Sequence, residues 1–214
     1  MKLYGYWRSS AAYRVRIALA LKGLDYEYVS VNLAKGEHRK PEYGEINPQN
    51  LVPVLEDEGK RLYQSPAIIQ YLDEKYPEPP ILPKDRLERN RVRSLALIVV
   101  CEIHPLNNPR VLNYLTQNFG ISEEQKQTWY AHWVQTGFAA LEKRLASEPQ
   151  TGRFCHGDTP GFADIALVPQ VANANRFKVD LAAFPTIRRI NEACSQLEAF
   201  KKAAPAQQPD AEKV

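Results

Sequence analysis

A proline-dense stretch near residue 80 most limits what this chain can fold into. Residues 77–83 read Pro-Glu-Pro-Pro-Ile-Leu-Pro, and proline both lacks the backbone N–H and clashes with the preceding turn of a helix. Before this stretch, strand-like and helix-like segments alternate, whereas the segments after it are helical in pattern. The 214 residues suffice for two modest domains. The sequence therefore predicts an α/β domain over residues 1–80 and an all-helical domain over residues 81–214.

The first domain is predicted to be a mixed sheet with helices packed on it. β-Branched and aromatic residues mark its strands, and apolar residues at helical spacing mark its helices. The expected strands are residues 2–6, 26–31, 52–56 and 61–63, and the expected helices are residues 10–22 and 65–76. A polar region between the second and third strands supplies one further short helix, which gives the order β-α-β-α-β-β-α.

The second domain is predicted to consist of helices. They are expected at residues 85–119, 122–147, 161–174 and 186–204. The first of them is expected to bend or break near His104-Pro105 and Pro109, because proline disrupts the interior of a helix. Ser122 and Gln125 have the spacing of a capping box. The polar tail, residues 205–214, is expected to be disordered.

Composition and charge exclude several classes of function. The net charge of +3 comes from 28 basic and 25 acidic residues, which are scattered along the chain. We therefore expect no nucleic-acid partner. No run approaches the ~18 apolar residues of a membrane span, and the N-terminus lacks the pattern of a secretory signal. We expect a cytoplasmic protein with no membrane partner.

The three cysteines do not form a recognisable motif. Cys101, Cys155 and Cys194 lie far apart in the sequence. They provide neither a Cys-x-x-Cys pair for disulfide exchange nor a cluster with zinc spacing. We expect the three side chains to be buried as small apolar groups, and we expect no metal site.

Two serines lie where the first predicted strand gives way to the first predicted helix, in the run Tyr6-Trp7-Arg8-Ser9-Ser10. The start of a helix collects unpaired backbone N–H groups and positive dipole, so it suits an anion such as a thiolate. Serine is also among the preferred residues for capping a helix. Ser9 and Ser10 therefore have two interpretations: a structural cap, or a cap that also activates a thiol.

Longer runs extend this pattern over nearly the whole chain. They are Ser9-Ser10-Ala11-Ala12-Tyr13-Arg14-Val15-Arg16-Ile17-Ala18, Asn47-Pro48, Val52-Pro53, Gln64-Ser65-Pro66-Ala67-Ile68-Ile69, residues 164–171 and residues 175–181. In this order they resemble the cytosolic glutathione transferases, most closely the zeta class. The resemblance implies a thioredoxin-like α/β N-terminal domain plus an all-α C-terminal domain, usually assembled as a homodimer.

The resemblance also implies glutathione as the cofactor. With no protein thiol near the first helix, a thioredoxin-like domain must use an external one, and a helix start with a hydroxyl donor lowers a thiol pKa. Ser9 would donate to the sulfur with Ser10 assisting, and Tyr6 is a rival donor. The residues expected to contact glutathione are Ser9, Ser10, Ala11, His38, Val52, Gln64, Ser65, His104, Asn108 and Arg110.

Val52-Pro53 and Gln64-Ser65 would bind the peptide part of glutathione. If Pro53 follows a cis bond, Val52 presents its backbone N–H and C=O to the cysteinyl unit; otherwise Pro53 merely begins a strand. Gln64 and Ser65, at the start of the next helix, offer an amide, a hydroxyl and free N–H groups to the γ-glutamyl carboxylate.

The activity implied by the resemblance is the isomerisation of maleylacetoacetate to fumarylacetoacetate, in tyrosine and phenylalanine breakdown. Addition of the thiolate makes the double bond single, rotation follows, and elimination returns glutathione. Arg8, with Ser9 and Ser10, completes the expected catalytic set by stabilising the enolate. Arg8, Arg110 and Arg176 are expected to bind the carboxylates of a small maleyl dicarboxylate.

Three alternatives stay open. The substrate would be maleylpyruvate if the same chemistry serves a shorter diacid. A broader glutathione transferase, or an enzyme that dehalogenates haloacids, would consume glutathione. A non-catalytic interaction module on the same scaffold would neither bind glutathione nor turn over substrate.

Two positions depart from the zeta pattern. Ala11 stands where the pattern commonly has cysteine, so any role of that thiol is absent. Gly161 replaces a Ser or Thr cap three residues before Asp164. Glycine at such a cap costs only a few tenths of a kcal/mol, about 0.3, so this change concerns stability rather than chemistry.

Overall fold

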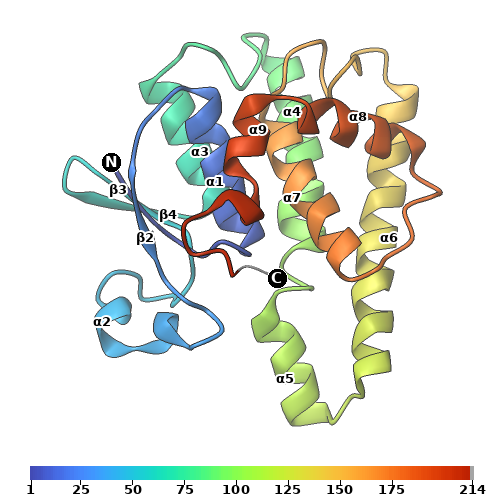
Figure 1. The fold of residues 1–214 in the computed structure, drawn as a ribbon. Helices are drawn as coiled ribbons and strands as arrows, with labels where there is room; N and C mark the ends of the chain where they lie inside the picture. Colours follow the sequence, from blue (N-terminus) through green and yellow to red (C-terminus); the bar gives the residue numbers. More distant parts are fainter. Residues whose placement is uncertain (213–214) are drawn as a thin grey trace. The chain divides into compact units, whose positions relative to one another are not determined.

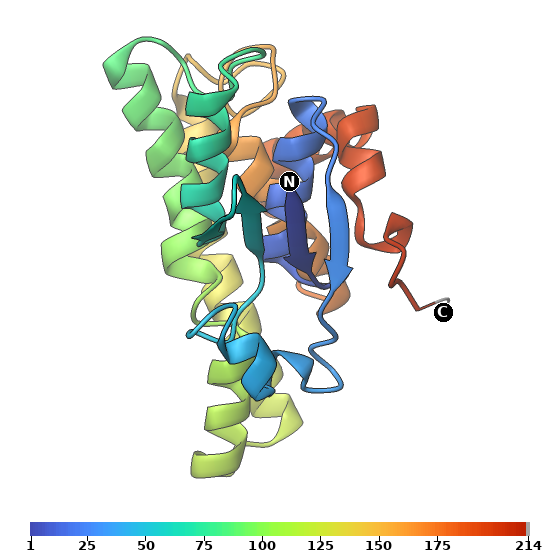
Figure 2. The same cartoon turned by 90° about the vertical axis from the view of Figure 1, so that its left-hand side faces the viewer.

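The computed structural model describes residues 1–212 and shows two compact units (Figures 1 and 2). The first unit contains Met1–Ile81 together with the segment that begins at Gln196, and the second contains Leu82–Ser195. The division predicted from the sequence, residues 1–80 and 81–214, differs from this at the C-terminus. The physical reason is that the last segment is hydrogen-bonded to the first unit.

The first unit is built on a four-stranded sheet with the strand order β2-β1-β3-β4. β1 (Lys2–Gly5) runs parallel to β2 (Glu27–Ser30) and antiparallel to β3 (Val54–Asp57), which pairs antiparallel with β4 (Lys60–Tyr63). Parallel neighbours need a crossover connection, which α1 (Ser10–Leu21) provides. The predicted mixed sheet is confirmed, and Figure 2 shows it face-on.

Two helices, α1 and α3 (Ser65–Lys75), lie side by side on one face of this sheet (Figure 1). The core of the unit is apolar, because Leu3 and Leu55 of the strands and Ile17 and Ile68 of the helices have no exposed surface. The connection from β2 to β3 contains two short helical segments, η1 (Glu37–Arg39) and α2 (Pro41–Gly44). The short helix expected in this polar region is therefore present.

A buried lysine holds the C-terminal ends of α1 and α3 together. The Nζ of Lys22 donates to Asp73 Oδ1 at 2.7 Å, to the Tyr76 carbonyl at 2.7 Å and to the Pro79 carbonyl at 2.6 Å. An ammonium group has three donors, so each of its protons has an acceptor. Asp73 Oδ1 also accepts the backbone N–H of Ile81 at 2.8 Å. This network fastens the proline-rich stretch to the first unit.

The C-terminal segment is ordered as far as the structure describes it. It forms α9 (Glu198–Ala203) and η3 (Pro205–Gln207), and the buried Gln208 donates to the carbonyls of Lys202 and Ala204. The expected disorder of the tail is therefore wrong for residues 205–212, while residues 213–214 lie outside the described chain. Polar composition was misleading here because the tail is held mainly by hydrogen bonds.

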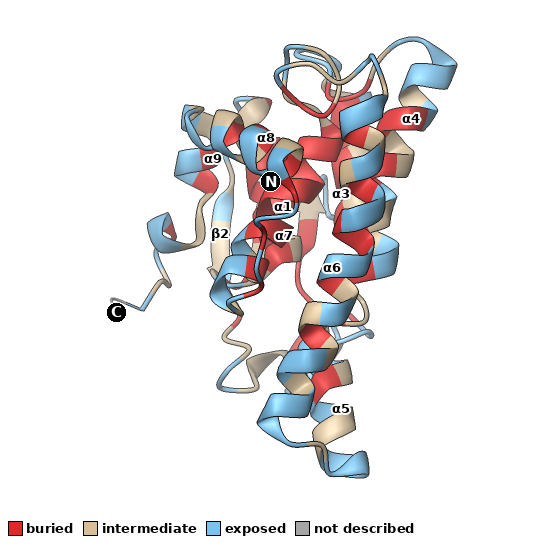
Figure 3. Ribbon diagram, turned by 90° about the vertical axis from the view of Figure 1, so that its right-hand side faces the viewer, coloured by how far each residue is buried: buried red, intermediate tan, exposed pale blue. Residues whose placement is uncertain are grey.

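The second unit is entirely helical in the described structure. Its helices are α4 (Arg86–Leu97), the π-helical segment η2 (Ile98–Ile103), α5 (Pro109–Phe119), α6 (Glu123–Ser147), α7 (Phe162–Arg176) and α8 (Pro185–Ser195). Figure 3 contrasts α7, which is mostly buried, with α5, in which Leu112 is the one buried residue and the others are exposed or of intermediate burial. The predicted all-helical character of this part of the chain is confirmed.

The long helix expected over residues 85–119 is interrupted as predicted. α4 changes to π-helical hydrogen bonding in η2, and α5 begins only at Pro109. η2 packs closely on α6, since a Cβ placed on Gly137 would lie 2.3 Å from Cγ1 of Ile103. Because glycine has no Cβ, Ile103 of η2 can pack directly against the backbone of α6 at Gly137.

Capping at the starts of α6 and α7 bears on two features of the sequence, the predicted capping box and Gly161. Ser122 Oγ accepts the Gln125 N–H at 3.1 Å and Gln125 Oε1 accepts the Ser122 N–H at 2.8 Å, so the predicted capping box is confirmed. At α7, Gly161 has no side-chain oxygen, but Asp164 Oδ2 accepts its N–H at 2.9 Å. Burial raises the pKa of the Asp164 carboxyl.

No helix within residues 1–212 combines the length and the apolar character needed to cross a membrane.

Candidate active site

Ser9 caps α1 at the point where the chain leaves β1. Its Oγ accepts the Ala12 N–H at 3.2 Å, and its own N–H donates to the Tyr6 carbonyl at 2.9 Å. The capping interpretation of Ser9 is therefore confirmed. Ser10 is the first residue of the helix and is buried. The remaining N–H groups of this first turn, that of Ala11 among them, have no acceptor within the helix and leave positive potential at its start.

Arg8 precedes the two serines and is exposed. Its guanidinium lies over the Trp7 ring, 5.3 Å from the ring centroid, and forms no ion pair with a carboxylate among residues 1–212. A guanidinium stacked on an aromatic face is oriented without being neutralised. Arg8 therefore offers an unneutralised positive charge one residue from Ser9. Tyr6, the rival donor, is only 6% exposed in an apolar cluster with Val31 and Val52.

Val52-Pro53 is a cis peptide bond, as the resemblance implies. Within the described residues, the backbone N–H and C=O of Val52 take part in no hydrogen bond. The loop before it is fixed, since Asn47 Nδ2 and the Tyr43 hydroxyl each donate to the Leu51 carbonyl at 2.8 Å. A held backbone with an unpaired donor and acceptor can pair with an extended peptide, as an exposed strand edge does.

The start of α3 has an unusual backbone. Gln64 has φ 65° and ψ 111°, a left-handed region that residues other than glycine adopt at a cost of ~1–3 kcal/mol. Its exposed carboxamide is held by Gln49, with Nε2 and Oε1 2.9 Å apart. Ser65 follows as the first helical residue and is buried.

His38 lies on η1 and is half-buried. Its Nδ1 is buried without a hydrogen-bond partner among the described residues. Burial, and then the positive charge of Arg39, lower the pKa of His38. The ring is therefore neutral near pH 7 and has one nitrogen that lacks a protein partner.

The other predicted contacts belong to the second unit. His104 caps the end of η2 and is half-buried. Asn108 caps α5, with its Oδ1 accepting the Arg110 N–H at 3.1 Å, and Arg110 itself is exposed. The connection between these elements is tied to α6, because Trp129 Nε1 donates to the Leu106 carbonyl at 3.0 Å.

Arg176 ends α7 and is exposed. Its guanidinium lies 4.8 Å from the centroid of the Phe177 ring, which stacks on Tyr130 at 3.8 Å. Burial raises the pKa of the Tyr130 hydroxyl to about 12, although the charge of Arg176 opposes this. The predicted residues thus form two sets: Arg8, Ser9, Ser10, Ala11, His38, Val52, Gln64 and Ser65 in the first unit, and His104, Asn108, Arg110 and Arg176 in the second.

Comparison with known proteins identifies the family. The N-terminal domain of glutathione S-transferases matches residues 1–74, and the C-terminal domain of the same family matches residues 127–206. A solved maleyl pyruvate isomerase, described as a bacterial glutathione S-transferase in the zeta class, is 52% identical with a TM-score of 0.98, over 99% of this chain and 100% of its own. The chain belongs to the zeta class of the glutathione S-transferases. The predicted combination of a thioredoxin-like and an all-helical domain is confirmed.

Two further relatives bear on what a zeta-class transferase of this kind does. Maleylacetoacetate isomerase of Pseudomonas aeruginosa is 53% identical, with 98% of each chain covered. A maleylacetoacetate isomerase from Anaeromyxobacter dehalogenans, 43% identical with a TM-score of 0.87, covers 99% of this chain and 97% of its own. That structure has dicarboxyethyl glutathione and citrate bound in its active site.

Sequence reasoning missed Arg14 in this transferase. Arg14 is 1% exposed on α1, and its Nη1 donates to Ser65 Oγ at 3.4 Å. It thereby joins the helix that Ser9 caps to the helix that Ser65 begins, and it adds a positive charge between them. The sequence did hold an indication of this role: Arg14 stands between Tyr13 and Val15, on a helix whose apolar residues predict that it is buried against the sheet.

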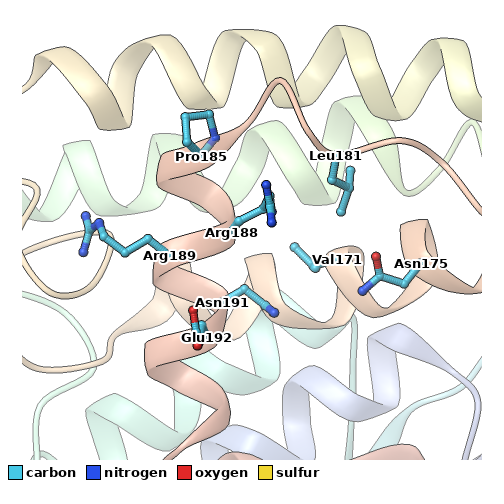
Figure 4. Close-up of a pocket in the computed structure, with 8 residues that line it drawn as sticks. All are labelled: Val171, Asn175, Leu181, Pro185, Arg188, Arg189, Asn191 and Glu192. Carbon is cyan, nitrogen blue, oxygen red and sulfur yellow. The ribbon is translucent and has the colours of Figure 1, made fainter.

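A hollow of about 390 Å³ lies in the second unit (Figure 4). Its lining residues come from α7, α8 and the connection between them: Val171, Asn175, Leu181, Pro185, Arg188, Arg189, Asn191 and Glu192. Arg189 is already engaged, because its guanidinium donates to the Gly152 and Arg153 carbonyls. None of the predicted site residues lines it.

Among the described residues, no group of three or more His, Cys, Asp or Glu side chains is placed to hold a metal ion.

Proposed function

We propose that this transferase catalyses the glutathione-dependent cis–trans isomerisation of maleylacetoacetate to fumarylacetoacetate. The observation that carries the proposal is the capped start of α1, where the positive end of the helix lies beside Ser9 and the exposed Arg8. Glutathione, when bound, would supply the thiol whose reversible addition allows the maleyl double bond to rotate. The relative that has dicarboxyethyl glutathione in its active site supports this reading, since a dicarboxylate joined to glutathione is the kind of adduct that such an addition gives.

The protein's own thiols do not suit the role of nucleophile. Cys155 and Cys194 are buried in the second unit, and burial raises the pKa of each thiol far above neutrality. Cys101 is exposed, so the expectation that all three cysteines are buried is wrong for this residue, which lies on η2 in the second unit. Because thiolates rather than thiols are nucleophilic, these observations favour a nucleophile that arrives with the cofactor.

The residues of the first unit fit the parts of glutathione. Val52 has an unpaired N–H and C=O for the backbone of the cysteinyl unit, and Gln64 and Ser65 provide an amide, a hydroxyl and a helix start for the γ-glutamyl carboxylate. His38, half-buried on η1, is the further glutathione contact proposed in this unit. Ser10 and Ala11 extend the set of amides at the start of α1. From the second unit, His104, Asn108 and Arg110 complete the proposed glutathione contacts.

Each catalytic residue has a defined task in this proposal. Ser9 donates its hydroxyl proton to the sulfur and lowers the thiol pKa together with the positive end of α1, and Ser10 assists. Arg8 stabilises the negative charge that develops on the substrate. Arg8, Arg110 and Arg176 bind the substrate carboxylates, for which the guanidinium fork is well shaped. The reaction needs no strong general base.

Maleylpyruvate is the second candidate substrate. The observation that favours it is the 52% identical relative with a TM-score of 0.98, which is described as a maleyl pyruvate isomerase. Both compounds are maleyl dicarboxylates, so the three arginines serve either one. Broader transferase activity, such as haloacid dehalogenation, would differ from both because it consumes glutathione.

A direct assay distinguishes these functions. Purified protein is given maleylacetoacetate or maleylpyruvate, with and without glutathione, and kcat/KM is measured for each. We expect turnover only with glutathione and the higher kcat/KM with maleylacetoacetate. A higher kcat/KM with maleylpyruvate would assign the second substrate. Equal rates without glutathione would refute the proposed chemistry, and loss of both glutathione binding and turnover would indicate a non-catalytic protein.

Replacing Gln64 by glycine separates backbone strain from cofactor binding. Glycine adopts the observed φ without strain but has greater freedom when unfolded, so we expect the free energy of unfolding to change by less than ~1 kcal/mol. The KM for glutathione should rise roughly tenfold to a hundredfold, because a hydrogen bond to a charged group contributes about 1.5–3 kcal/mol. Gln49→Ala, which removes only the partner of the Gln64 carboxamide, is the control and should raise KM less. An unchanged KM in Gln64→Gly would remove Gln64 from the site.

We also propose that the protein is a cytoplasmic homodimer. Membership of the glutathione S-transferase family supports this proposal, because cytosolic members of the family usually assemble as homodimers. Light scattering coupled to size exclusion should give twice the monomer mass of 24.4 kDa. A mass that stays at one chain at micromolar concentration would contradict the dimer.

A further inference from the structure

The carboxylate of Asp210 contacts the loop that leads into the proposed active site. Its Oδ2 accepts three hydrogen bonds: from the Trp7 backbone N–H at 3.1 Å, the Tyr28 hydroxyl at 3.2 Å and Ser30 Oγ at 3.0 Å. All of these residues belong to the first unit. Figure 2 shows the C-terminal segment running beside β2, which contributes Tyr28 and Ser30. A segment about 200 residues away in sequence is thus bonded to the peptide that precedes Arg8.

Arg16 makes a second connection between the same two segments. Its side chain is 1% exposed, and its Nε donates to the Ala203 carbonyl of α9 at 2.9 Å. Its Nη2 donates to the Trp7 carbonyl at 3.1 Å, and its Nη1 donates to the Tyr6 carbonyl at 3.5 Å. The C-terminal segment therefore holds the N–H of Trp7 directly and its C=O through Arg16. Both polar groups of this one residue's backbone are fixed.

The position of Ser9 depends on this loop. The N–H of Ser9 donates to the Tyr6 carbonyl, which is the same oxygen that Arg16 contacts. Trp7 and Arg8 lie between β1 and α1 and belong to neither. No regular element therefore fixes their backbone, and its restraint comes from Asp210 and Arg16. A shift of the Trp7 peptide would move Arg8 and the Ser9 hydroxyl together.

The charge on Asp210 suits this task better than a neutral amide would. Three donors converge on a single oxygen, which an anionic carboxylate oxygen accepts more strongly than an amide oxygen does. The other oxygen, Oδ1, is buried and has no hydrogen-bond partner within residues 1–212. Leaving a buried polar atom unpaired is costly. The carboxylate is thus poorly explained as a simple anchor for the tail.

We propose that Asp210 is a positioning residue for the reaction, through which the C-terminal segment holds the Trp7 peptide and sets the place of Ser9 and Arg8. The inference rests on the proposed function, because it assigns the tail a part in the site that binds the glutathione sulfur. Asp210 acts through Trp7 and touches neither cofactor nor substrate. The C-terminal segment then belongs to the catalytic unit as well as to its fold.

The test compares Asp210→Ala with two matched variants of the full-length protein. We expect Asp210→Ala to lower kcat about tenfold to a hundredfold, because small misplacements of reacting groups have effects of that size. KM for the maleyl substrate should change little. Amide hydrogen exchange in residues 6–10 should become faster, while exchange in α7 stays unchanged. Glu212→Gln removes an exposed carboxylate two residues away and should match the wild type in all three measurements.

A second comparison separates positioning from anchoring of the tail. The double variant Tyr28→Phe, Ser30→Ala removes two of the three donors to Asp210 but keeps the Trp7 contact. It should lower the melting temperature while leaving kcat and the exchange of residues 6–10 near wild-type values, and Asp210→Glu should recover part of the lost kcat. If Asp210→Ala and the double variant lose kcat equally, or if Asp210→Ala leaves both kcat and exchange unchanged, the positioning role is refuted.

These outcomes are distinguishable from failure of the proposed function. A wild-type protein that binds no glutathione and does not isomerise either substrate would refute the function itself. Hydrogen exchange in residues 6–10 would still report whether Asp210 orders the loop. If Asp210→Ala does not fold, the isosteric Asp210→Asn replaces it, and a wild-type kcat in that variant overturns the proposal.

Discussion

Replacing Ser9 by alanine is expected to lower kcat/KM for maleyl isomerisation roughly 10²- to 10³-fold, the usual effect of removing one donor to a developing anion. The hydroxyl now caps α1 through the Ala12 N–H, and in the proposed complex its proton faces the sulfur. The pH at which the bound thiol ionises should therefore rise, which is measured by following the ultraviolet absorbance of the thiolate as pH is raised. Loss of the cap alone lowers the free energy of unfolding by about 1 kcal/mol.

The control for this prediction is Ser122→Ala. Ser122 caps α6 in the second unit through the Gln125 N–H, so its loss removes a comparable cap with no effect on the sulfur. We expect similar stability in the two variants but near wild-type kcat/KM only in Ser122→Ala. If Ser9→Ala keeps full activity and an unshifted thiol pKa, the activating hydroxyl belongs to Ser10 or Tyr6.

Lys22→Met is expected to have the largest effect on stability, lowering the free energy of unfolding by about 3–5 kcal/mol. The side chain of Lys22 has no exposed surface, and that of Asp73 is only 6% exposed. Without the ammonium, the Asp73 carboxylate keeps the Ile81 N–H as a hydrogen-bond donor but loses its positive partner, and the Tyr76 and Pro79 carbonyls lose their donor. Denaturant titration at pH 7 measures the difference.

Lys75→Met is the matched control for Lys22→Met. Lys75 also pairs with carboxylates, Asp57 at 2.5 Å and Glu58 at 2.8 Å, but its own side chain is 25% exposed, against 9% for Asp57 and 75% for Glu58. Partly solvated pairs of this kind contribute about 1 kcal/mol or less. Equal losses in the two variants would show that the burial of Lys22 does not determine its contribution.

Much of the fold could be predicted because local pattern and tertiary structure agree. The period of the apolar residues and the prolines at 77–83 each act within a few positions, so they mark elements and breaks directly. The ordered tail could not be predicted in this way. Asp210 is a polar residue in a proline-containing segment, and only its distant partners, Trp7, Tyr28 and Ser30, show why it is held.

The candidate site was predictable to the extent that its residues lie at element ends. Ser9, Ser65 and Asn108 lie at helix starts, where a short polar side chain is informative by itself. Arg14 and Arg16 were not identified, since arginines within a helix ordinarily extend into solvent. Their function depends on which face of α1 is buried and on carbonyl and hydroxyl groups from other segments, neither of which local sequence specifies.

The most direct test of the central account is the number of product molecules formed per molecule of glutathione. Purified protein is incubated with excess maleylacetoacetate and a small, known amount of glutathione, and both product and remaining glutathione are quantified. The account predicts many molecules of the trans isomer per glutathione, with all of the glutathione recovered unchanged. One product per glutathione with the thiol consumed, or an equal rate when glutathione is omitted, would contradict it.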